Sequence, residues 1–379
     1  MKLIIAGGGT GGHLFPGIAV AEEFLGRDST NEVLFVGSER GIEARAIPRL
    51  GYRLELISAA GVKGKWMGAQ LKGALLLLYG YAQSRKIIRD FKPDMVLGVG
   101  GYASLPMVLA ASGMNIPRFI HEQNALPGMT NKLLSRFADK VFASLEDSLQ
   151  FFPESNTLLT GNPLRQQILE NSGSRVQGPG ASEQLESGPR TLDPGPCFHI
   201  FVFGGSQGAH ALNVALPQAL AQLGNQHGQI TIVHQTGEND LSDVQQTYRN
   251  AGVAADVRPF IDDMAQEYRR ADLIVCRAGA TTIAEITAIG KACLFIPFPH
   301  ATDDHQRKNA EALLKTGACA MLLEREMSPE HLVTVIAGLM DNRAALARMA
   351  ENAASLAKTD AAQVIVDEML KGLQPCTEK

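Results

Sequence analysis

Two glycine-rich segments, each following directly on a short apolar run, constrain this chain more than any other feature. Residues 7–12 are Gly-Gly-Gly-Thr-Gly-Gly and follow the run 3–6, whereas residues 204–208 are Gly-Gly-Ser-Gln-Gly and follow the run 201–203. A strand that passes through glycines into a helix presents backbone N–H groups at the helix N-terminus, where the helix dipole favours an anion. Two such junctions predict two nucleotide-binding domains that face one deep interdomain cleft, and they favour phosphorylated ligands.

The length supports the same division. A chain of 379 residues exceeds one ordinary core, and two domains of about 150–200 residues each are expected. Gly, Pro and Ser interrupt every periodic pattern between residues 172 and 196, which is typical of a linker or loop. We therefore predict an N-terminal domain over 1–163, a linker with a Gly/Pro-rich loop over 164–196, a second domain over 197–355, and a C-terminal helical segment over 356–379 that packs back on the first domain.

Short β-type runs alternate with helical patterns in both halves, which indicates parallel βαβ units. The predicted fold class is therefore α/β, with two Rossmann-like domains. The expected strands are Lys2–Ala6, Glu32–Val36, Arg53–Ile57, Met95–Val99, Arg118–His121, Lys140–Ala143 and Thr157–Thr160 in the first half, and His199–Phe203, Gln229–Gln235, Ala255–Val257, Leu273–Cys276, Cys293–Ile296 and Ala320–Leu323 in the second.

Composition argues against several classes of protein. The formal charge of -4 gives no electrostatic reason to expect a nucleic-acid partner. The 5 cysteines are scattered and include no C-x-x-C pair, which argues against a disulfide framework or a zinc site and indicates a reducing compartment. The apolar start is too short for a signal-peptide core. We therefore expect a cytoplasmic protein.

One apolar segment has basic flanks. Residues 74–82 are apolar but fall short of the roughly 20 residues that span a bilayer. A basic and apolar mixture of this kind suits an anionic membrane surface, whereas the alternative is an ordinary core helix with solvated basic ends. The flanking residues are Lys63, Lys65, Trp66, Met67 and Lys72 before the segment and Arg85, Lys86 and Arg89 after it.

Neither glycine loop fits a standard nucleotide motif well. Residues 7–12 satisfy G-x-G-x-x-G only because they are nearly all glycine, and no P-loop lysine follows either loop. A better anion site is predicted at residues 276–282, where a strand ends in a turn of small residues and Thr281 and Thr282 begin a helix. Glu285, one turn further, is placed to accept both hydroxyls of a ribose. The alternative is a carboxylate that stabilises the helix dipole.

Polar side chains also follow other strands, at the edge where ligands contact open α/β sheets. They occur at residues 121–124, at the glycine turn 98–104 and at residues 297–309. The His and Asp spacing of the last segment matches no usual ligand set, so we expect no metal and favour hydrogen bonds to a polyol. Arg165, after the turn 161–163, is placed at a hinge where its guanidinium could reach a phosphate. A solvated surface arginine is the alternative.

Six of these motifs occur in one order along essentially the whole chain. They are residues 8–13, 100–102, 121–124, 161–163, 204–209 and 277–285. In this order the sequence resembles the peptidoglycan N-acetylglucosaminyltransferases of glycosyltransferase family 28. The resemblance implies a GT-B fold without a cofactor, and transfer of GlcNAc from UDP-GlcNAc to the C4 hydroxyl of the muramoyl sugar of lipid I. The product would be lipid II, with inversion at the anomeric carbon, made by a peripheral enzyme on the cytoplasmic face of the plasma membrane.

The resemblance also implies roles for individual residues. Most donor contacts would come from the second domain, with Arg165 near the diphosphate and the acceptor held by the first domain. The donor set is Ser206, Gln207, Ala280, Thr281 and Thr282 on the diphosphate, the backbone of Ile261 on uracil, Glu285 on ribose, His305 and Gln306 on GlcNAc, and Thr10, Gly11, Gly12 and Asn124 from the first domain. The acceptor set is Gly8, Gly9, His13 and Tyr102, which would also receive the lipid diphosphate.

Inverting transfer requires a base for the acceptor hydroxyl and stabilisation of the leaving UDP. His13 is the first candidate base because an ordinary imidazole is partly neutral at working pH. A structural histidine that hydrogen-bonds the loop is the alternative, and Glu122 is the fallback base. The helix dipole, backbone N–H groups and Arg165 would stabilise the departing UDP.

Two other classes of function stay open at this point. Another GT-B sugar-nucleotide enzyme, such as an epimerase or a transferase with a soluble acceptor, would not need the basic and apolar segment 63–89. A non-enzymatic module that binds nucleotide sugars would bind UDP without turnover.

Overall fold

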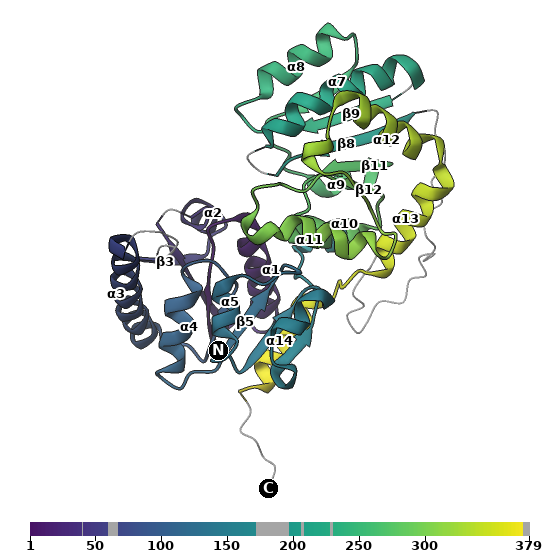
Figure 1. Ribbon diagram of the computed structural model, residues 1–379. Helices are drawn as coiled ribbons and strands as arrows, with labels where there is room; N and C mark the ends of the chain where they lie inside the picture. Colours follow the sequence, from purple (N-terminus) through teal and green to yellow (C-terminus); the bar gives the residue numbers. More distant parts are fainter. Residues whose placement is uncertain (40, 60–66, 172–196, 206–207, 228–229, 374–379) are drawn as a thin grey trace. The chain divides into compact units, whose positions relative to one another are not determined.

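The computed structural model describes residues 1–39, 41–59, 67–171, 197–205, 208–227 and 230–373. Its contacts divide the chain into two compact units (Figure 1). The first unit comprises Met1–Gln166 and the C-terminal segment from Lys358, and the second comprises Gln167–Ala357. The predicted Gly/Pro-rich loop 172–196 lies outside the described residues.

The first unit contains a 7-stranded parallel sheet in the order β3-β2-β1-β4-β5-β6-β7. The direction of winding reverses between β1 and β4, and this switch point is where ligands bind in open α/β sheets. The strands are β1 (Lys2–Ala6), β2 (Glu32–Ser38), β3 (Arg53–Ile57), β4 (Met95–Gly98), β5 (Arg118–Glu122), β6 (Lys140–Ala143) and β7 (Thr157–Leu159).

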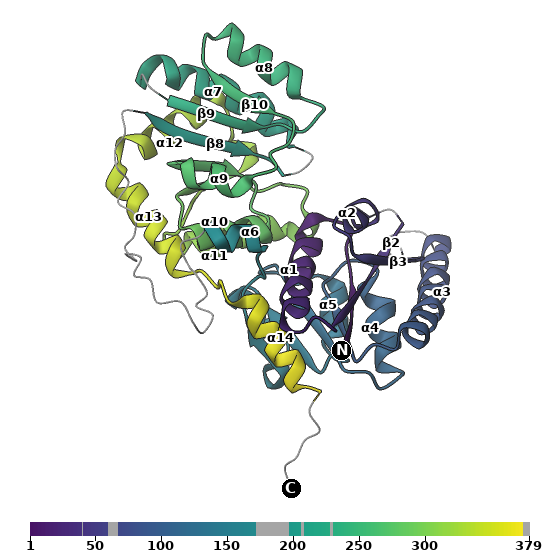
Figure 2. The ribbon, with the colours of Figure 1, turned by 180° about the vertical axis from the view of Figure 1, so that it is seen from behind.

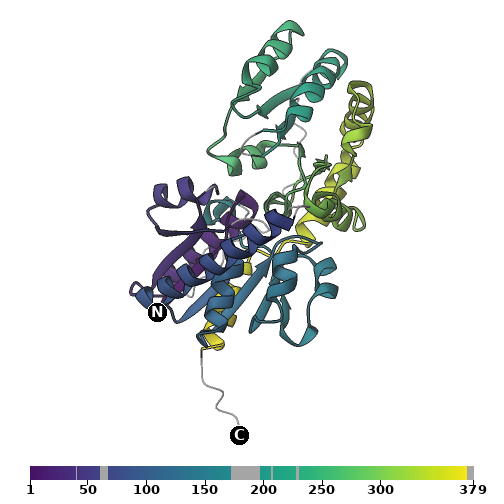
Figure 3. The same ribbon diagram turned by 60° about the vertical axis from the view of Figure 1, so that its left-hand side comes forward.

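Helices cover both faces of this sheet because successive strand residues point to opposite sides. Leu3 and Ile5 pack into one buried cluster, whereas Ile4 and Ala6 pack into another. Figure 3 shows α3 and α4 in front of the sheet. One layer contains α1 (Gly11–Arg27), α2 (Glu43–Arg49) and α14 (Ala361–Lys371), and the other contains α3 (Met67–Phe91), α4 (Ser104–Ser112) and α5 (Met129–Leu134).

The last helix, α14, belongs to the first unit and lies beside α1 (Figure 2). Ile365 and Met369 are fully buried there, and each such side chain contributes about 1.5–3 kcal/mol through apolar burial. Arg27 of α1 pairs with Asp367 at 3.1 Å. The chain therefore returns to its first unit after completing the second.

The second unit repeats the architecture with a 6-stranded parallel sheet in the order β10-β9-β8-β11-β12-β13. Its winding reverses between β8 and β11. The strands are β8 (Phe198–Phe203), β9 (Ile230–Gln235), β10 (Ala255–Arg258), β11 (Leu273–Cys276), β12 (Cys293–Phe295) and β13 (Ala320–Met321). Every predicted strand in both sheets is present, and the strand ends differ from the prediction by at most two residues.

Ile200 and Val202 of β8 pack toward one helical layer. On the other face, Phe201 and Phe203 make edge-to-face contacts with Tyr268 of α9 (Met264–Arg270). The buried cluster that contains Ile200 and Val202 also includes residues of α7 (His210–His227), α8 (Leu241–Asn250), α12 (Pro329–Asp341) and α13 (Arg343–Ser355). The unit also contains α10 (Ala280–Ile289) and α11 (His305–Leu314). Along the chain, the division between the units falls after Gln166, the first residue of α6 (Gln166–Asn171). Short 3₁₀ turns occupy Glu146–Phe151, Glu154–Asn156, Thr302–Asp304 and Glu324–Glu326.

Candidate active site

The switch point of the first unit is formed by two glycine turns that meet backbone to backbone. Gly8 and Gly9 have φ angles of 132° and 91°, which residues other than glycine rarely adopt. A Cβ on Gly101 would lie 2.4 Å from the carbonyl oxygen of Gly8. The loop after β1 and the turn after β4 therefore form one surface at the carboxyl edge of the sheet.

His13 lies in the first turn of α1, against this surface. A Cβ on Gly100 would lie 2.7 Å from His13 Cδ2, so the glycine provides the space that the imidazole occupies. The Thr10 hydroxyl lies 3.3 Å from His13 Nδ1 and orients the ring. Tyr102, in the same glycine turn as Gly100, is 55% exposed. The structure thus brings together His13, Thr10 and the predicted glycines.

A residue that the sequence analysis did not single out holds this loop. Glu43, at the start of α2, is 1% exposed. Its Oε2 accepts a hydrogen bond from the N–H of Gly9 at 2.7 Å, and its Oε1 accepts from the N–H of Ser38 at 2.9 Å. The only sequence signal was its place two residues after Gly41, just beyond β2.

Glu122, the fallback base, closes its own loop. Its Oε1 accepts from the backbone N–H and the Nδ2 of Asn124 at 2.9 and 3.2 Å, and its Oε2 accepts from Asn131 Nδ2 at 2.9 Å and the N–H of Gly128 at 3.2 Å. Four donors match the roughly four lone-pair positions of a carboxylate. Burial raises the pKa of Glu122, while these hydrogen bonds oppose the rise. The carboxylate therefore holds the loop of residues 122–131 in place, and this use of its oxygens argues against proton abstraction by Glu122.

The neighbouring His121 is buried and neutral. Gln123 Nε2 donates to its Nδ1 at 3.0 Å, so the ring proton is assigned to Nε2, which lies 3.1 Å from Ser144 Oγ and 3.3 Å from the carbonyl oxygen of Gly161. Burial lowers the pKa of His121 to about 4. The predicted motifs at 121–124 and 161–163 therefore meet through this imidazole.

Arg165 packs on α1. Its guanidinium lies 4.6 Å from the centre of the Phe15 ring. The pKa of Glu22, on the same helix, is raised by burial and lowered by a hydrogen bond from the backbone of Gln166 and by the charge of Arg165. Arg165 is therefore held by side chains of the first unit, which differs from the solvated arginine considered above.

The switch point of the second unit is also built on glycines. Ser206 and Gln207 lie outside the described residues. Gly208 has a φ of 76°, and a Cβ there would lie 1.7 Å from the carbonyl oxygen of Thr236. Only glycine allows the end of this loop to reach the turn that follows β9.

The side chain of Gln235 connects this loop to the predicted uracil contact. Its Nε2 donates to the carbonyl oxygen of Gly205 at 2.9 Å, and its Oε1 accepts from the N–H of Ile261 at 2.9 Å. The backbone N–H of Ile261 is thus engaged within the protein, so recognition of uracil at this residue would fall to its carbonyl oxygen.

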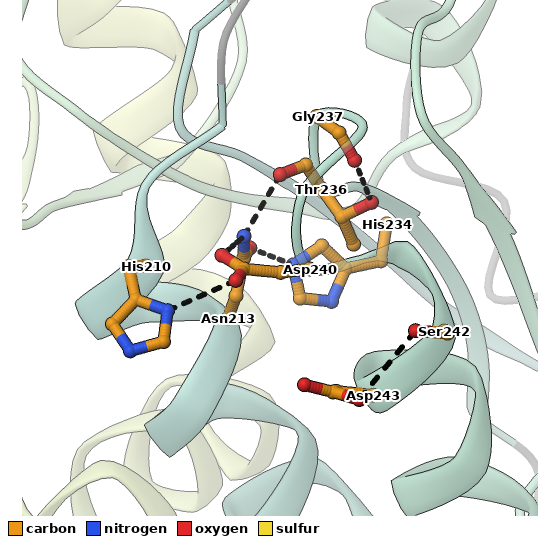
Figure 4. Close-up of polar contacts among 8 residues, drawn as sticks. All are labelled: His210, Asn213, His234, Thr236, Gly237, Asp240, Ser242 and Asp243. Carbon is orange, nitrogen blue, oxygen red and sulfur yellow. Dashed lines mark hydrogen bonds and ion pairs between the residues drawn. The ribbon is translucent and has the colours of Figure 1, made fainter.

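A polar network supports the same turn from below (Figure 4). Asn213 Nδ2 donates to the carbonyl oxygen of Thr236 at 2.8 Å and to Asp240 Oδ2 at 2.7 Å. Asp240 also contacts His210 Nδ1 at 3.0 Å. These hydrogen bonds lower the pKa of Asp240 and tie the start of α7 to the end of β9.

His234 completes this network inside the core. Its Nε2 lies 3.1 Å from Asn213 Oδ1, and its Nδ1 lies 3.1 Å from the hydroxyl of Tyr248. Because the amide oxygen can only accept, the proton is assigned to Nε2 and the Tyr248 hydroxyl donates to Nδ1. Burial lowers the pKa of His234 to about 3.

The predicted diphosphate and ribose residues lie on α10. Gly279 precedes the helix without a side-chain cap, which leaves a helix N-terminus suited to an anion. Thr281 and Thr282 are half-buried in its first turn. Glu285 is buried, and its Oε2 accepts a hydrogen bond from the hydroxyl of Tyr268 at 2.9 Å. Tyr268 therefore orients the carboxylate predicted to take the ribose.

His305 and Gln306 begin α11 after an unusual turn. Asp303 and Asp304 both have positive φ angles, 53° and 57°, a conformation that costs energy and often marks functional sites. His305 Nδ1 lies 2.7 Å from the carbonyl oxygen of Thr302, and Gln306 Oε1 accepts from the N–H of Phe298 at 3.0 Å. The turn therefore fixes the backbone positions of both residues whose side chains are predicted to bind the sugar.

Two features of the described residues bear on other functions. These residues contain no group of three or more His, Cys, Asp or Glu placed to hold a metal ion. None of the helices found in them combines the length and the apolar character needed to cross a membrane. Helix α3 nevertheless exposes Leu75 and Leu78, at 59% and 65%.

Comparison with known proteins defines the class. The glycosyltransferase family 28 N-terminal domain matches residues 3–143, and the glycosyltransferase family 28 C-terminal domain matches residues 199–365. The chain belongs to glycosyltransferase family 28, and its two parallel-sheet domains have the GT-B fold.

Full-length relatives narrow this class further. The chain is 69% identical to a protein of Trichlorobacter lovleyi over 100% of both chains, and 62% identical to one of Pelobacter propionicus over 98% of this chain and 99% of the relative. Both relatives are named UDP-N-acetylglucosamine–N-acetylmuramyl-(pentapeptide) pyrophosphoryl-undecaprenol N-acetylglucosamine transferase.

Solved structures agree with this placement. The crystal structure of MurG from Acinetobacter baumannii is 33% identical, with a TM-score of 0.78 over 98% of this chain and 99% of that one. A UDP-GlcNAc 2-epimerase from Neisseria meningitidis, solved with UDP-GlcNAc, has a TM-score of 0.64 over 98% of this chain and 100% of that one, but only 13% identity. The second likeness concerns the fold alone.

Proposed function

We infer that this chain is the transferase that moves N-acetylglucosamine from UDP-GlcNAc to the C4 hydroxyl of the N-acetylmuramyl sugar of lipid I, giving lipid II. The observation that carries this conclusion is the full-length identity of 69% to a relative that bears the transferase name. The two glycine-built switch points, one in each unit, are consistent with separate acceptor and donor sites.

The second unit binds the donor in this proposal. The N-terminus of α10 holds the diphosphate through backbone N–H groups, with Thr281 and Thr282 beside it. Glu285, oriented by Tyr268, accepts the ribose hydroxyls. His305 and Gln306 contact the sugar. The buried Glu285 supports this role, because a carboxylate in a low dielectric forms strong hydrogen bonds to hydroxyl donors.

The first unit binds the acceptor, and His13 removes the proton from the attacking hydroxyl. As the C1–O bond to UDP breaks, the hydroxyl oxygen bonds to C1 from the opposite face, its proton passes to His13, and the electron pair leaves with UDP. The contacts of Glu122 favour His13 over Glu122 as the base. The α10 N-terminus and Arg165 stabilise the negative charge on the departing diphosphate.

The acceptor carries a lipid, and α3 is the surface we propose for the membrane. Leu75, Leu78 and Tyr79 are exposed, and Lys86 and Arg89 are exposed about two to four turns further along the helix. Their spacing of three, four and seven residues places them on one face. Apolar residues followed by basic ones suit an anionic leaflet on the cytoplasmic side. Lys63, Lys65 and Trp66 lie outside the described residues.

Transfer of radiolabelled GlcNAc from UDP-GlcNAc to a lipid I analogue tests the function. We expect a labelled lipid product that depends on both substrates and on the enzyme. Epimerised or hydrolysed UDP-GlcNAc without a labelled lipid would instead indicate another GT-B sugar-nucleotide enzyme. Binding of UDP without any turnover would indicate a non-enzymatic module.

Co-sedimentation with phosphatidylglycerol vesicles tests the membrane surface. A basic side chain near an anionic surface contributes about 1 kcal/mol, so Lys86→Gln with Arg89→Gln should weaken binding roughly 30-fold. Lys315→Gln with Arg325→Gln, which removes two exposed basic side chains of the second unit, is the matched control for the loss of positive charge. Undiminished binding of the α3 double variant would favour a soluble acceptor.

A further inference from the structure

We propose that Glu43 is a positioning residue for the transfer reaction, which sets the conformation of the first glycine loop and thereby the place of His13. This inference rests on the proposed function, because it assumes that the loop carries the acceptor-side chemistry. Glu43 itself lies behind the loop and is assigned no contact with a substrate.

Three hydrogen bonds define the brace. The Oε2 of Glu43 accepts from the N–H of Gly9 at 2.7 Å, and its Oε1 accepts from the N–H and the hydroxyl of Ser38 at 2.9 and 3.1 Å. Gly9 belongs to the loop after β1 and Ser38 ends the neighbouring strand β2. One carboxylate thus ties together the ends of two adjacent parallel strands.

The space around the carboxylate is bounded by glycines. A Cβ on Gly8 would lie 2.3 Å from Glu43 Cδ, and one on Gly41 would lie 2.0 Å from Oε2. A Cβ on Gly37 would lie 2.3 Å from Glu43 Cγ. These glycines therefore make room for the Glu43 side chain, in addition to shaping the loop that was predicted to bind an anion.

The brace reaches His13 through a short stretch of backbone. Gly9, which Glu43 holds, precedes Thr10, and the carbonyl oxygen of Thr10 accepts from the N–H of His13 at 3.2 Å. The Thr10 hydroxyl also lies 3.3 Å from the imidazole. Release of Gly9 would let Thr10 and the first turn of α1 shift, and small displacements of a base lower the rate of proton transfer.

A carboxylate suits this position better than an amide. All three partners donate, and the two oxygens of a carboxylate can only accept, whereas glutamine would turn an N–H₂ group toward one of the donors. Glu43→Gln keeps the size of the side chain and removes one half of the brace. Ser38→Ala removes only the hydroxyl donor and leaves the contact with Gly9.

The test compares Glu43→Gln, Ser38→Ala and the control Glu55→Gln, which changes an exposed glutamate of β3. We measure transfer to a lipid I analogue, calorimetric binding of UDP, and hydrogen exchange of the amides of residues 7–14. For Glu43→Gln we expect a kcat at least about tenfold lower per UDP-binding molecule, as for a misplaced catalytic group. UDP affinity should be unchanged and exchange of the loop faster. Ser38→Ala should have a small effect, and Glu55→Gln none.

Each alternative outcome has a distinct meaning. Faster loop exchange with unchanged kcat would overturn the positioning role, because the loop would then move without affecting transfer. A lower calorimetric stoichiometry of UDP binding that accounts for the whole loss of activity, with kcat per UDP-binding molecule unchanged, would show a general loss of folded protein and would also overturn it. A lower KM for the lipid I analogue in Glu43→Gln, with kcat unchanged, would show that the carboxylate chiefly repels the lipid diphosphate and would overturn the positioning role. Absence of transfer by the parent chain would instead overturn the proposed function, whatever the exchange data show.

Discussion

The two glycine loops occupy the same place in their respective sheets but are held in opposite ways. In the first unit a carboxylate, Glu43, takes the N–H of Gly9. In the second unit an amide, Gln235, donates to the carbonyl oxygen of Gly205. An anion is bound by N–H groups and repelled by a nearby carboxylate. Equivalent positions in a repeated fold therefore need not bind the same group, and the second loop is the better suited of the two to a diphosphate.

The sharpest test of this difference concerns the histidines that begin the two following helices. His13→Ala should lower kcat about 10²–10⁴-fold, the usual contribution of a general base, with little change in UDP binding. Its counterpart His210, at the start of α7, has a side chain that is 79% exposed, and His210→Ala should cost far less. The radiolabelled transfer assay measures both. Unchanged turnover in His13→Ala would remove it from the mechanism, and equal losses would erase the distinction between the loops.

The second prediction concerns the donor side. Glu285→Gln should raise the KM for UDP-GlcNAc about tenfold to a hundredfold, because hydrogen bonds to a charged acceptor contribute roughly 1.5–3 kcal/mol. The value of kcat at saturating donor should change much less. Glu351→Gln, at an exposed position of α13, is the control. A loss confined to kcat would place Glu285 in the chemical step and not in donor binding.

The third prediction compares two glycines of the second loop. Gly208→Ala would place a Cβ 1.7 Å from the carbonyl oxygen of Thr236, whereas Gly205→Ala meets nothing within 4 Å. Both carry the strain of a positive φ, about 1–2 kcal/mol, but only the first forces the loop to move. UDP affinity should therefore fall roughly tenfold more for Gly208→Ala than for Gly205→Ala. Similar affinities in calorimetry would mean that the loop does not contact UDP.

The smallest effect is on stability at acid pH, where both units should behave alike. The pKa is lowered to about 4 for His121 and about 3 for His234, so each is neutral when folded and becomes charged on unfolding below the ordinary value of about 6.5. Above that pH both histidines are neutral in the folded and the unfolded chain, so they do not lower the free energy of unfolding. As the pH falls from there toward each folded value, the free energy of unfolding drops by about 1.4 kcal/mol per pH unit for each histidine.

Denaturant unfolding between pH 7.5 and pH 5 measures this slope. His121→Gln and His234→Gln should each flatten it, since the glutamine does not titrate. If one variant is too unstable to study, the other still provides the comparison. A slope that neither replacement changes would mean that other groups cause the acid sensitivity.

The sequence by itself determined the class of fold, the strands of both sheets and the family. These follow from local patterns, because a buried parallel strand needs a run of apolar residues and a tight strand-to-helix turn needs glycine. It also marked the residues of α10 and the histidine of the first loop as candidates. A shared cleft between the two domains stays a prediction, and so do the roles of all the predicted site residues, including Asn124, Ser206 and Gln207.

Only the tertiary structure decided which groups restrain these loops. Glu43 is far from Gly9 in the sequence, and no periodic pattern relates the two. The same holds for Gln235 with Ile261 and for Arg165 with Phe15. The four donors around Glu122 are close in sequence, but their convergence depends on how the loop folds. Strands depend on residues that are neighbours in the sequence. The hydrogen bonds that hold the glycine loops join segments that are distant in the sequence, so their partners can be identified only once the chain has folded.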